Sequence, residues 1–240
     1  MSTPGSGTVA FVRMSELGPA WANRDFHMHT RYTDGKADVA QMLRRAEEAG
    51  LSEVAFTEHV RKDSSWFVRF AAEVRAAAEA SPVRVWVGCE SRILDEDGNL
   101  DINDEIRGLC DVVLASVHRF PGPDGAPRAF SQVPKHEFAG IERGLSLGFL
   151  RRGGAHVLAH PGGMSLRYGD GFPEAYFVEL AEAARAAGIA IEINTSYTKD
   201  LAPVIRAYRQ VDPLVSVASD AHDVDEVATC RNILKELLWR

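Results

Sequence analysis

Short apolar runs recur along the chain, and the segments between them place apolar residues at helical spacing. The runs at 24–29, 53–57, 83–89, 111–117, 155–159, 189–193 and 214–219 each predict a strand. After the first run, Val39, Met42, Leu43 and Ala46 recur at helical spacing, and Gly50 stands where a helix would end. Strands that alternate with helices in this way predict repeated βαβ units and a mainly parallel sheet.

Histidines and carboxylates gather where the predicted strands end. They follow six of the seven runs, whereas a doubly wound sheet would concentrate its site at one switch point. This distribution is the pattern of a closed barrel with its site at the carboxyl ends of the strands. We therefore predict an α/β fold, an irregular, TIM-like (β/α) barrel of seven strands with its active site at the C-terminal rim. The candidate metal ligands are His27, His29, Asp34, His59, Glu90, His118, His160, Asp220 and His222.

The first of these residues predict a clamp for a metal ion. His27 and His29 lie two positions apart on a strand, so their side chains point to the same face, and Asp34 follows five residues later. Imidazoles and carboxylates without thiolates suit Zn, Mn or Fe in a catalytic site. Nine candidate donors exceed what one ion needs, which predicts two or three divalent ions with a bridging carboxylate such as Glu90.

Each candidate also has an ordinary structural interpretation. His118 would end a strand, Asp220 would begin the last helix as its N-cap, and Glu90 would form an ion pair at the rim. These interpretations require a coincidence at nearly every strand end, so a metal site is the better hypothesis. His136, near a helix start, and His156, at the beginning of its strand, are expected to be structural instead.

The composition is that of an ordinary globular chain with an excess of acidic residues. Its 240 residues suit one domain, which we place at 21–240 after a loose N-terminal arm at 1–20. The net charge of −7 argues against a broad nucleic-acid surface, but not against a local basic pocket. Of the three widely spaced cysteines, Cys89 and Cys110 are expected to be buried thiols. No apolar run has membrane length and no signal-peptide pattern is seen, so we expect a cytoplasmic protein without a membrane partner.

A series of short motifs connects the candidate ligands to a known family. The motifs stand in order between about residues 24 and 223, and they resemble the full series of the polymerase and histidinol phosphatase (PHP) superfamily. They are His27-Met28-His29 with Asp34, Thr57-Glu58-His59, Gly88-Cys89-Glu90, Ser116-Val117-His118, Ala159-His160-Pro161 and Ser219-Asp220-Ala221-His222. The resemblance implies a distorted seven-stranded barrel, a trinuclear metal centre and metal-dependent hydrolysis of a phosphoester.

The resemblance also implies how the ligands divide among three ions. The three sets are His27, His29, Glu90 and Asp220; then Glu90, His118 and His160; then Asp34, His59 and His222. In such a centre we expect a metal-activated hydroxide to attack phosphorus. Asp220 and His222 are the candidate catalytic residues that would supply a proton to the leaving group.

Arginines follow several of the candidate ligands closely. A guanidinium is a natural partner for phosphate because it donates two parallel hydrogen bonds. We expect at least one of them to bind the phosphate of the substrate. The candidates are Arg31, Arg61, Arg92, Arg119 and Arg167.

The motifs point to two branches of the superfamily. Residues 56–59, 153–161 and 192–196 resemble histidinol phosphatases, whereas 88–94 and 98–102 resemble stand-alone phosphoesterases and the domain attached to family-X DNA polymerases. We expect a phosphatase that acts on a small phosphorylated metabolite, with histidinol phosphate among the candidates.

Three alternatives remain open at this point. One is a phosphodiesterase or exonuclease acting on nucleotides or DNA ends, for which Trp66, Phe67 and Phe120 are candidate stacking residues at the rim. Another is an amidohydrolase-like C–N hydrolase, which the lack of a strand-borne lysine for bridging two ions disfavours. The last is a metal-binding module without activity, which the complete set of ligands disfavours.

Overall fold

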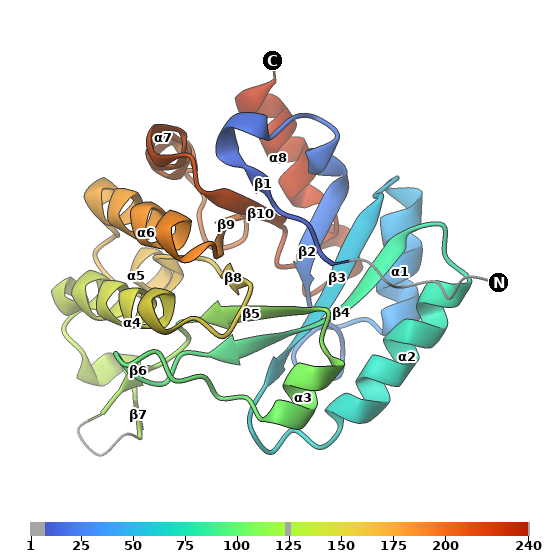
Figure 1. Cartoon of the computed structure of the whole chain (residues 1–240), viewed down its shortest axis with the longest axis horizontal. Helices are drawn as coiled ribbons and strands as arrows, with labels where there is room; N and C mark the ends of the chain where they lie inside the picture. The colour runs from blue at the N-terminus through green and yellow to red at the C-terminus, as the bar shows by residue number, and fades with distance from the viewer. Residues whose placement is uncertain (1–7, 123–125, 240) are drawn as a thin grey trace.

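The computed structural model describes residues 8–122 and 126–239, and a mostly parallel sheet lies at its centre (Figure 1). Every neighbouring pair of strands in this sheet is parallel except β1 and β10. The predicted α/β fold is therefore confirmed. In spatial order the strands are β1 (Val12–Arg13), β10 (Leu214–Ala218), β9 (Ala190–Asn194), β8 (Val157–Leu158), β5 (Val112–Ser116), β4 (Arg84–Arg92), β3 (Glu53–Val60) and β2 (Arg24–Met28).

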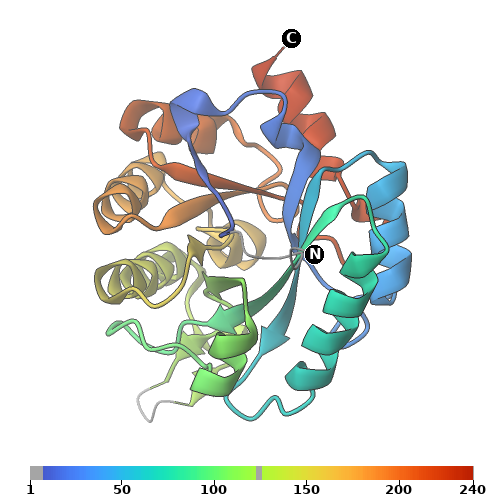
Figure 2. The same cartoon turned by 45° about the vertical axis from the view of Figure 1, so that its right-hand side comes forward.

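Helices surround the strands in both views (Figure 1, Figure 2). Their ends follow local sequence signals: Asp38 and Gln41 form a reciprocal capping box at the start of α1, and α6 ends at Gly188 in the left-handed region. A small hairpin of β6 (Phe120–Pro121) and β7 (Pro127–Arg128) stands apart from the main sheet. The α-helices are α1 (Val39–Glu48), α2 (Phe67–Glu79), α3 (Asp104–Leu109), α4 (Phe138–Arg152), α5 (Gly163–Tyr168), α6 (Glu174–Ala187), α7 (Ala202–Val211) and α8 (Thr229–Leu238).

The sheet has eight strands in the described residues, one more than predicted. Its seven parallel strands are those that the apolar runs predict, and the added strand is β1. The ladders do not form a continuous ring, but β2 and β10 meet at their carboxyl ends through one parallel bridge between Met28 and Ala221. There the His29 N–H donates to the Ala221 carbonyl over 2.8 Å. The carboxyl ends of the first and last parallel strands are therefore neighbours.

The described part of the expected N-terminal arm is packed rather than loose. Val12 pairs with Val215, the Met14 N–H donates to the Pro213 carbonyl over 2.9 Å, and Leu17 is buried. Residues 1–7 of the expected arm lie outside the described residues. The prediction failed for residues 12–17 because a two-residue strand followed by one turn of 3₁₀ helix (Met14–Glu16) is too short to show a periodic pattern.

One face of the sheet changes from apolar to polar along the strands. A compact apolar cluster includes Phe26, Trp86 and Leu114, while the larger cluster lies between the sheet and the helices. Phe26 and Met28 belong to different clusters although they lie two residues apart, and the register of β2 against β3 shifts between Asp25 and Met28. The irregularity falls where the strand passes from the apolar Phe26 to His27, and such irregularities often occur next to functional sites.

None of the described helices combines the length and apolar character that a membrane span requires.

Candidate metal centre

All nine predicted ligands come together at the carboxyl ends of the parallel strands, with Glu90 in the middle. One Glu90 oxygen, Oε1, lies 2.8 Å from His160 Nε2 and 3.2 Å from His118 Nε2. The other, Oε2, lies 2.7 Å from His59 Nδ1 and within 3.6 Å of Nε2 of both His27 and His29. One buried carboxylate thus contacts five imidazoles, which suits the bridging role predicted for it.

Within the described residues, three groups of side chains have donor atoms close enough together to hold an ion. Their composition differs from the sets implied by the family resemblance: His160 belongs to none of them, and Glu90 joins only the group with His59 and His118. His29 also joins the group around Asp34, and His59 also joins Glu90 and His118, because each histidine lies between two groups. The groups are His29, Asp34, His59 and His222; His27, His29 and Asp220; and His59, Glu90 and His118.

The inner part of the centre, which we define as His27, His29, Glu90, His160 and Asp220, is almost fully buried. Nε2 of His27 and both ring nitrogens of His29 find no hydrogen-bond partner among the described residues, and Oε2 of Glu90 has only its ion-pair contacts there. Buried polar atoms are rarely left unpaired, because each costs free energy. Unpaired nitrogen and oxygen donors that converge at one point fit divalent cations.

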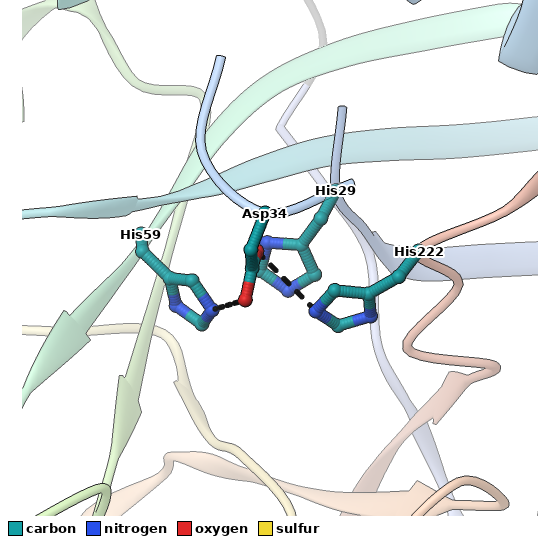
Figure 3. A group of neighbouring side chains, drawn as sticks. All are labelled: His29, Asp34, His59 and His222. Carbon is teal, nitrogen blue, oxygen red and sulfur yellow. Dashed lines mark ion pairs between the residues drawn. The ribbon is translucent and has the colours of Figure 1, made fainter. Parts of the chain in front are cut away.

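The outer part consists of Asp34, His59 and His222 (Figure 3). The Asp34 carboxylate lies between the two imidazoles, with Oδ2 3.3 Å from His59 Nε2 and Oδ1 3.4 Å from His222 Nε2. Nδ1 of His222 lies 2.9 Å from the Asp220 carbonyl, so it donates there and leaves Nε2 facing Asp34. The side chains of Asp34, His59 and His222 are 55%, 31% and 30% exposed, respectively.

The carboxylates and imidazoles strongly shift one another's pKa. Burial opposes ionisation of Glu90 and Asp220, but the surrounding histidines outweigh it and hold both pKa values well below the ordinary range. Burial likewise opposes a charge on His59, yet Glu90 and Asp34 raise its pKa to about 10. Burial and the nearby His59 lower the pKa of His29 to about 3. Protons on imidazoles balance the carboxylates here, and divalent ions would replace those protons.

The backbone that carries the ligands is unusual at three positions. His160 and Asp220 have positive φ angles of 28° and 55°, which non-glycine residues rarely adopt. A side chain on Gly35 would place its Cβ 2.5 Å from the His29 carbonyl oxygen, so the turn that presents Asp34 requires glycine. Rare conformations of this kind cluster at functional sites.

Three buried acids support the ligands and were not predicted from the sequence. Asp25 accepts from the N–H of Ser219, next to Asp220, over 2.9 Å. Glu58 accepts from the N–H of Thr30, next to His29, over 2.7 Å. Glu192 contacts His27. The available signal was an acidic residue inside an apolar strand run, as at Glu192, because such a residue must find a buried partner.

A cavity of about 990 Å³ opens over the outer part of the centre, and predicted arginines line it. Arg61, Arg92, Arg119 and Arg167 face this cavity. Arg92 is held by Asp101 at 3.1 Å. Arg31 is not brought to the cavity: its guanidinium donates to Gln41 over 2.9 Å and pairs with Asp38, because the chain turns sharply after Thr30.

Aromatic side chains form part of the same wall. Arg167 lies over the Tyr197 ring at 3.8 Å from its centroid, and Tyr197 in turn stacks on His160 with 4.4 Å between ring centroids. Of the rim aromatics predicted from sequence, Trp66 lines the cavity. Phe67 and Phe120 do not, because both are fully buried in the apolar core. The other aromatic residues lining the cavity, which sequence reasoning missed, are Phe130, Tyr168 and Tyr197.

The two histidines that were expected to be structural lie away from the cluster. His156 Nδ1 accepts from the Val113 N–H over 2.9 Å, and the His136 side chain is largely exposed. The cysteines are free thiols: Cys89 is buried as expected, Cys110 is only half-buried, contrary to expectation, and Cys230 is also buried.

Comparison with known proteins places this arrangement in context. Residues 25–196 match the family model described as the PHP domain. A DNA polymerase/3′-5′ exonuclease PolX of Bacillus subtilis is 28% identical over 225 residues, which are 89% of this chain and 36% of the polymerase. The chain thus spans about a third of that relative's length. A protein of Caldicellulosiruptor bescii described as a probable phosphatase is 25% identical over 215 residues, which are 85% of this chain and 81% of that protein.

A solved structure shares the fold over nearly the whole chain. It is the histidinol phosphate phosphatase of Lactococcus lactis, determined with zinc, L-histidinol and phosphate. The TM-score is 0.66 at 18% identity, and the match covers 90% of this chain and 94% of that one.

Proposed function

Because the chain belongs to the PHP domain family, we infer that it is a metal-dependent phosphoesterase that hydrolyses a phosphate monoester of a small metabolite. The observation that carries this inference is the convergence of His, Asp and Glu donors around Glu90, beneath a cavity lined by arginines. Cations beside guanidinium groups match the charge of a phosphoryl group.

The proposed centre holds two or three divalent ions of Zn, Mn or Fe. When bound, such ions polarise phosphoryl oxygens and provide a water of lowered pKa as the nucleophile. The unpaired inner nitrogens and the bridging geometry of Glu90 support this assignment. The proposed ligands are His27, His29, Asp34, His59, Glu90, His118, His160, Asp220 and His222.

The residues around the cavity would orient the substrate and move protons. Arg61, Arg119 and Arg167 are proposed to hold phosphate oxygens, with Arg92 positioned by Asp101. The histidines around Asp220 hold its pKa low against the effect of burial, so Asp220 is ionised, which suits a metal ligand and leaves His222 as the proposed proton donor. Asp34 and Asp220 outweigh burial to raise the pKa of His222, so Nε2 of His222 can give a proton to the leaving oxygen whenever that nitrogen is not coordinated.

Histidinol phosphate is a candidate substrate, and nucleotides form the second candidate class. The fold shared with a histidinol phosphate phosphatase supports the first candidate, because it provides a compatible scaffold. Two observations favour nucleotides or DNA ends. One is the similarity to part of a protein described as a DNA polymerase/3′-5′ exonuclease, and the other is the aromatic wall of the cavity. The net charge of −7 favours a small molecule over long nucleic acid.

The proposed architecture is a distorted seven-stranded barrel within one domain at 21–240. The bridge between Met28 and Ala221 supports it, since it joins the first and last parallel strands at the end where the ligands lie. We regard β1 as an addition that pairs with the opposite end of β10.

Metal analysis followed by a phosphate-release panel tests the proposed function. Protein purified without chelator should contain Zn, Mn or Fe, and it should release phosphate from at least one monoester. The panel should contain histidinol phosphate, sugar phosphates, mononucleotides and a short single-stranded oligonucleotide. Cleavage of the oligonucleotide alone, which frees mononucleotides and no phosphate and is followed by chromatography, would replace the monoesterase proposal by the nuclease one. The absence of both phosphate release and oligonucleotide cleavage, with each metal supplied, would overturn both proposals.

A further inference from the structure

One buried carboxylate behind the centre contacts two ligand-bearing segments at once. Glu192, on β9, is 1% exposed and belongs to none of the three donor groups. Its Oε1 lies 2.9 Å from Nδ1 of His27. Its Oε2 accepts from the backbone N–H of His160 over 2.8 Å and from Nδ2 of Asn194 over 3.0 Å. Of these three partners, His27 and His160 are proposed ligands, and Asn194 also donates to Asp220 Oδ2 over 3.4 Å.

The contact with His27 decides which ring nitrogen faces the centre. A neutral imidazole carries one proton, and a carboxylate accepts it. With the proton on Nδ1, directed at Glu192, the lone pair of Nε2 points toward Glu90 Oε2 and Asp220 Oδ1, which lie 3.4 and 3.6 Å away. In the described structure this Nε2 has no hydrogen-bond partner. Histidine ligands commonly have their other nitrogen fixed in this way.

The contact with His160 supports a rare backbone conformation. His160 has a φ of 28°, and the following Gly162 has a φ of 78°. The hydrogen bond from the His160 N–H to Glu192 holds the residue where its Nε2 reaches Glu90 Oε1, 2.8 Å away. In the proposed ligand sets, His27 and His160 serve different ions.

We propose that Glu192 is a positioning residue that couples two metal sites, by fixing the His27 ring through one oxygen and the His160 backbone through the other. This inference rests on the proposed metal-dependent function. It predicts that one substitution outside the ligand set weakens two ions together.

Glutamine tests the idea sharply because it has nearly the same shape but only one acceptor oxygen. If the Gln oxygen faces His27 Nδ1, its NH₂ group opposes the N–H of His160 and the amide of Asn194. If the oxygen faces His160, the NH₂ group opposes Nδ1, and His27 must move its proton to Nε2, where it blocks metal binding. Neither orientation satisfies both contacts.

The matched control is Glu142→Gln. Glu142 is equally buried, accepts from the N–H groups of Met164 and Ser165 over 3.2 and 2.8 Å, and has no hydrogen bond to a proposed ligand. The Glu142→Gln variant therefore loses a buried carboxyl group but keeps the contacts of Glu192 with the His27 ring and the His160 N–H.

Zinc titration of the metal-depleted full chain against a chromophoric chelator provides the first readout. We expect Glu192→Gln to bind two ions about 10- to 100-fold more weakly than the wild type, and Glu142→Gln to bind them as the wild type does. ¹⁵N spectra of histidine in the zinc-loaded wild type give the second readout, with the His27 signals assigned by their loss in His27→Ala. We expect a proton on Nδ1 of His27 and none on Nε2.

The outcomes separate this inference from the proposed function. A wild type that binds no Zn, Mn or Fe overturns both. A wild type that binds zinc, together with a Glu192→Gln variant of equal affinity and stoichiometry, overturns the coupling alone. If Glu192→Gln does not fold by circular dichroism, the wild-type spectrum decides: a proton on Nε2 of His27, or none on Nδ1, overturns the inference.

Discussion

The inner and outer parts of the metal centre use the same kinds of ligand but hold them differently. The inner residues lie at strand ends, are nearly fully buried, and are supported by further buried acids such as Glu192 and Asp25. In the outer part, Asp34 and His222 lie in turns beyond the strands, and the Asp34 side chain is 55% exposed. The inner ligands are thus held by buried partners, although Glu90 and Asp220 also border the cavity, whereas the outer ligands are partly exposed in it.

This difference teaches that ligand type alone does not set how firmly an ion is held. A donor whose rotamer and second nitrogen are fixed by buried partners loses little freedom on binding. A half-exposed donor must be ordered by the ion itself, and water competes for it. We therefore expect inner ions to stay bound during substrate turnover and an outer ion to exchange.

The largest expected effect comes from Glu90→Gln, which removes the carboxylate shared by both parts. Because Glu90 contacts five imidazoles, bound metal should fall to a fraction of the wild-type value. The kcat/KM should fall by about 1,000-fold or more, since metal ions stabilise the transition state by several kcal/mol. Elemental analysis and phosphate release measure both quantities. His59→Ala should lose less metal than Glu90→Gln. Equal losses of metal in the two variants would show that Glu90 is not a ligand shared by the two parts.

A smaller and more selective loss is expected from Asp34→Asn in the outer part. The amide keeps the shape but weakens the contacts with His59 and His222, which are 3.3 and 3.4 Å away. One ion should be lost while the inner ions remain, and activity should fall on the order of 10- to 100-fold, or 1.4 to 2.7 kcal/mol. Brief exposure of the wild type to a chelator should give the same state, and added metal should restore it. Simultaneous release of all ions would show that the inner and outer parts bind their ions equally tightly.

Substitution of Arg167 should change substrate binding without changing metal content. The guanidinium stacks on Tyr197 and lines the cavity, so Arg167→Ala should raise KM about 10- to 100-fold, as expected for loss of a hydrogen bond to a charged group worth about 1.5–3 kcal/mol. Steady-state kinetics and elemental analysis together measure this. The control is Arg31→Ala, whose exposed contacts with Asp38 and Gln41 lie outside the cavity and should leave KM within about twofold. A loss of metal in Arg167→Ala would contradict the assignment.

The sequence predicted which candidate ligands come together because the ends of the strands can be recognised in it. Each apolar run has a definite end, and parallel strands bring those ends to the same side of a sheet, so the spacing predicted which residues meet. The α/β fold followed from the same alternation. The two-residue β1 left no such pattern, and it was missed.

The supporting residues could not be predicted in the same way. Glu192, Glu58 and Asp25 act through partners 25 or more positions away, and nothing local identifies those partners. Rim residues depend on the paths of turns, which is why Arg31 faces Gln41 and not the cavity. Phe67 and Phe120 failed as rim residues because an aromatic side chain next to a strand end fits the core equally well.

The smallest expected effect is on stability, from Glu142→Gln behind the inner part. Burial raises the pKa of Glu142 despite hydrogen bonds from Ser165 and Met164, so the folded chain keeps this proton at pH values where the unfolded chain has lost it. The free energy of unfolding of the wild type should therefore fall as the pH rises above the ordinary glutamate value, until the folded pKa is passed.

Glutamine does not titrate, so the variant should gain stability relative to the wild type as the pH rises from about 4 to about 8, and the gain should level off once the folded pKa of Glu142 is passed. Urea unfolding of both metal-free proteins across this range measures the difference. Bound zinc should be unchanged, because Glu142 holds α5 through Met164 and Ser165 and makes no hydrogen bond to a ligand. A variant that becomes relatively less stable with rising pH would show that Glu142 is ionised in the fold. The inner part would then be supported by a charge at α5, and its rigidity would depend on pH.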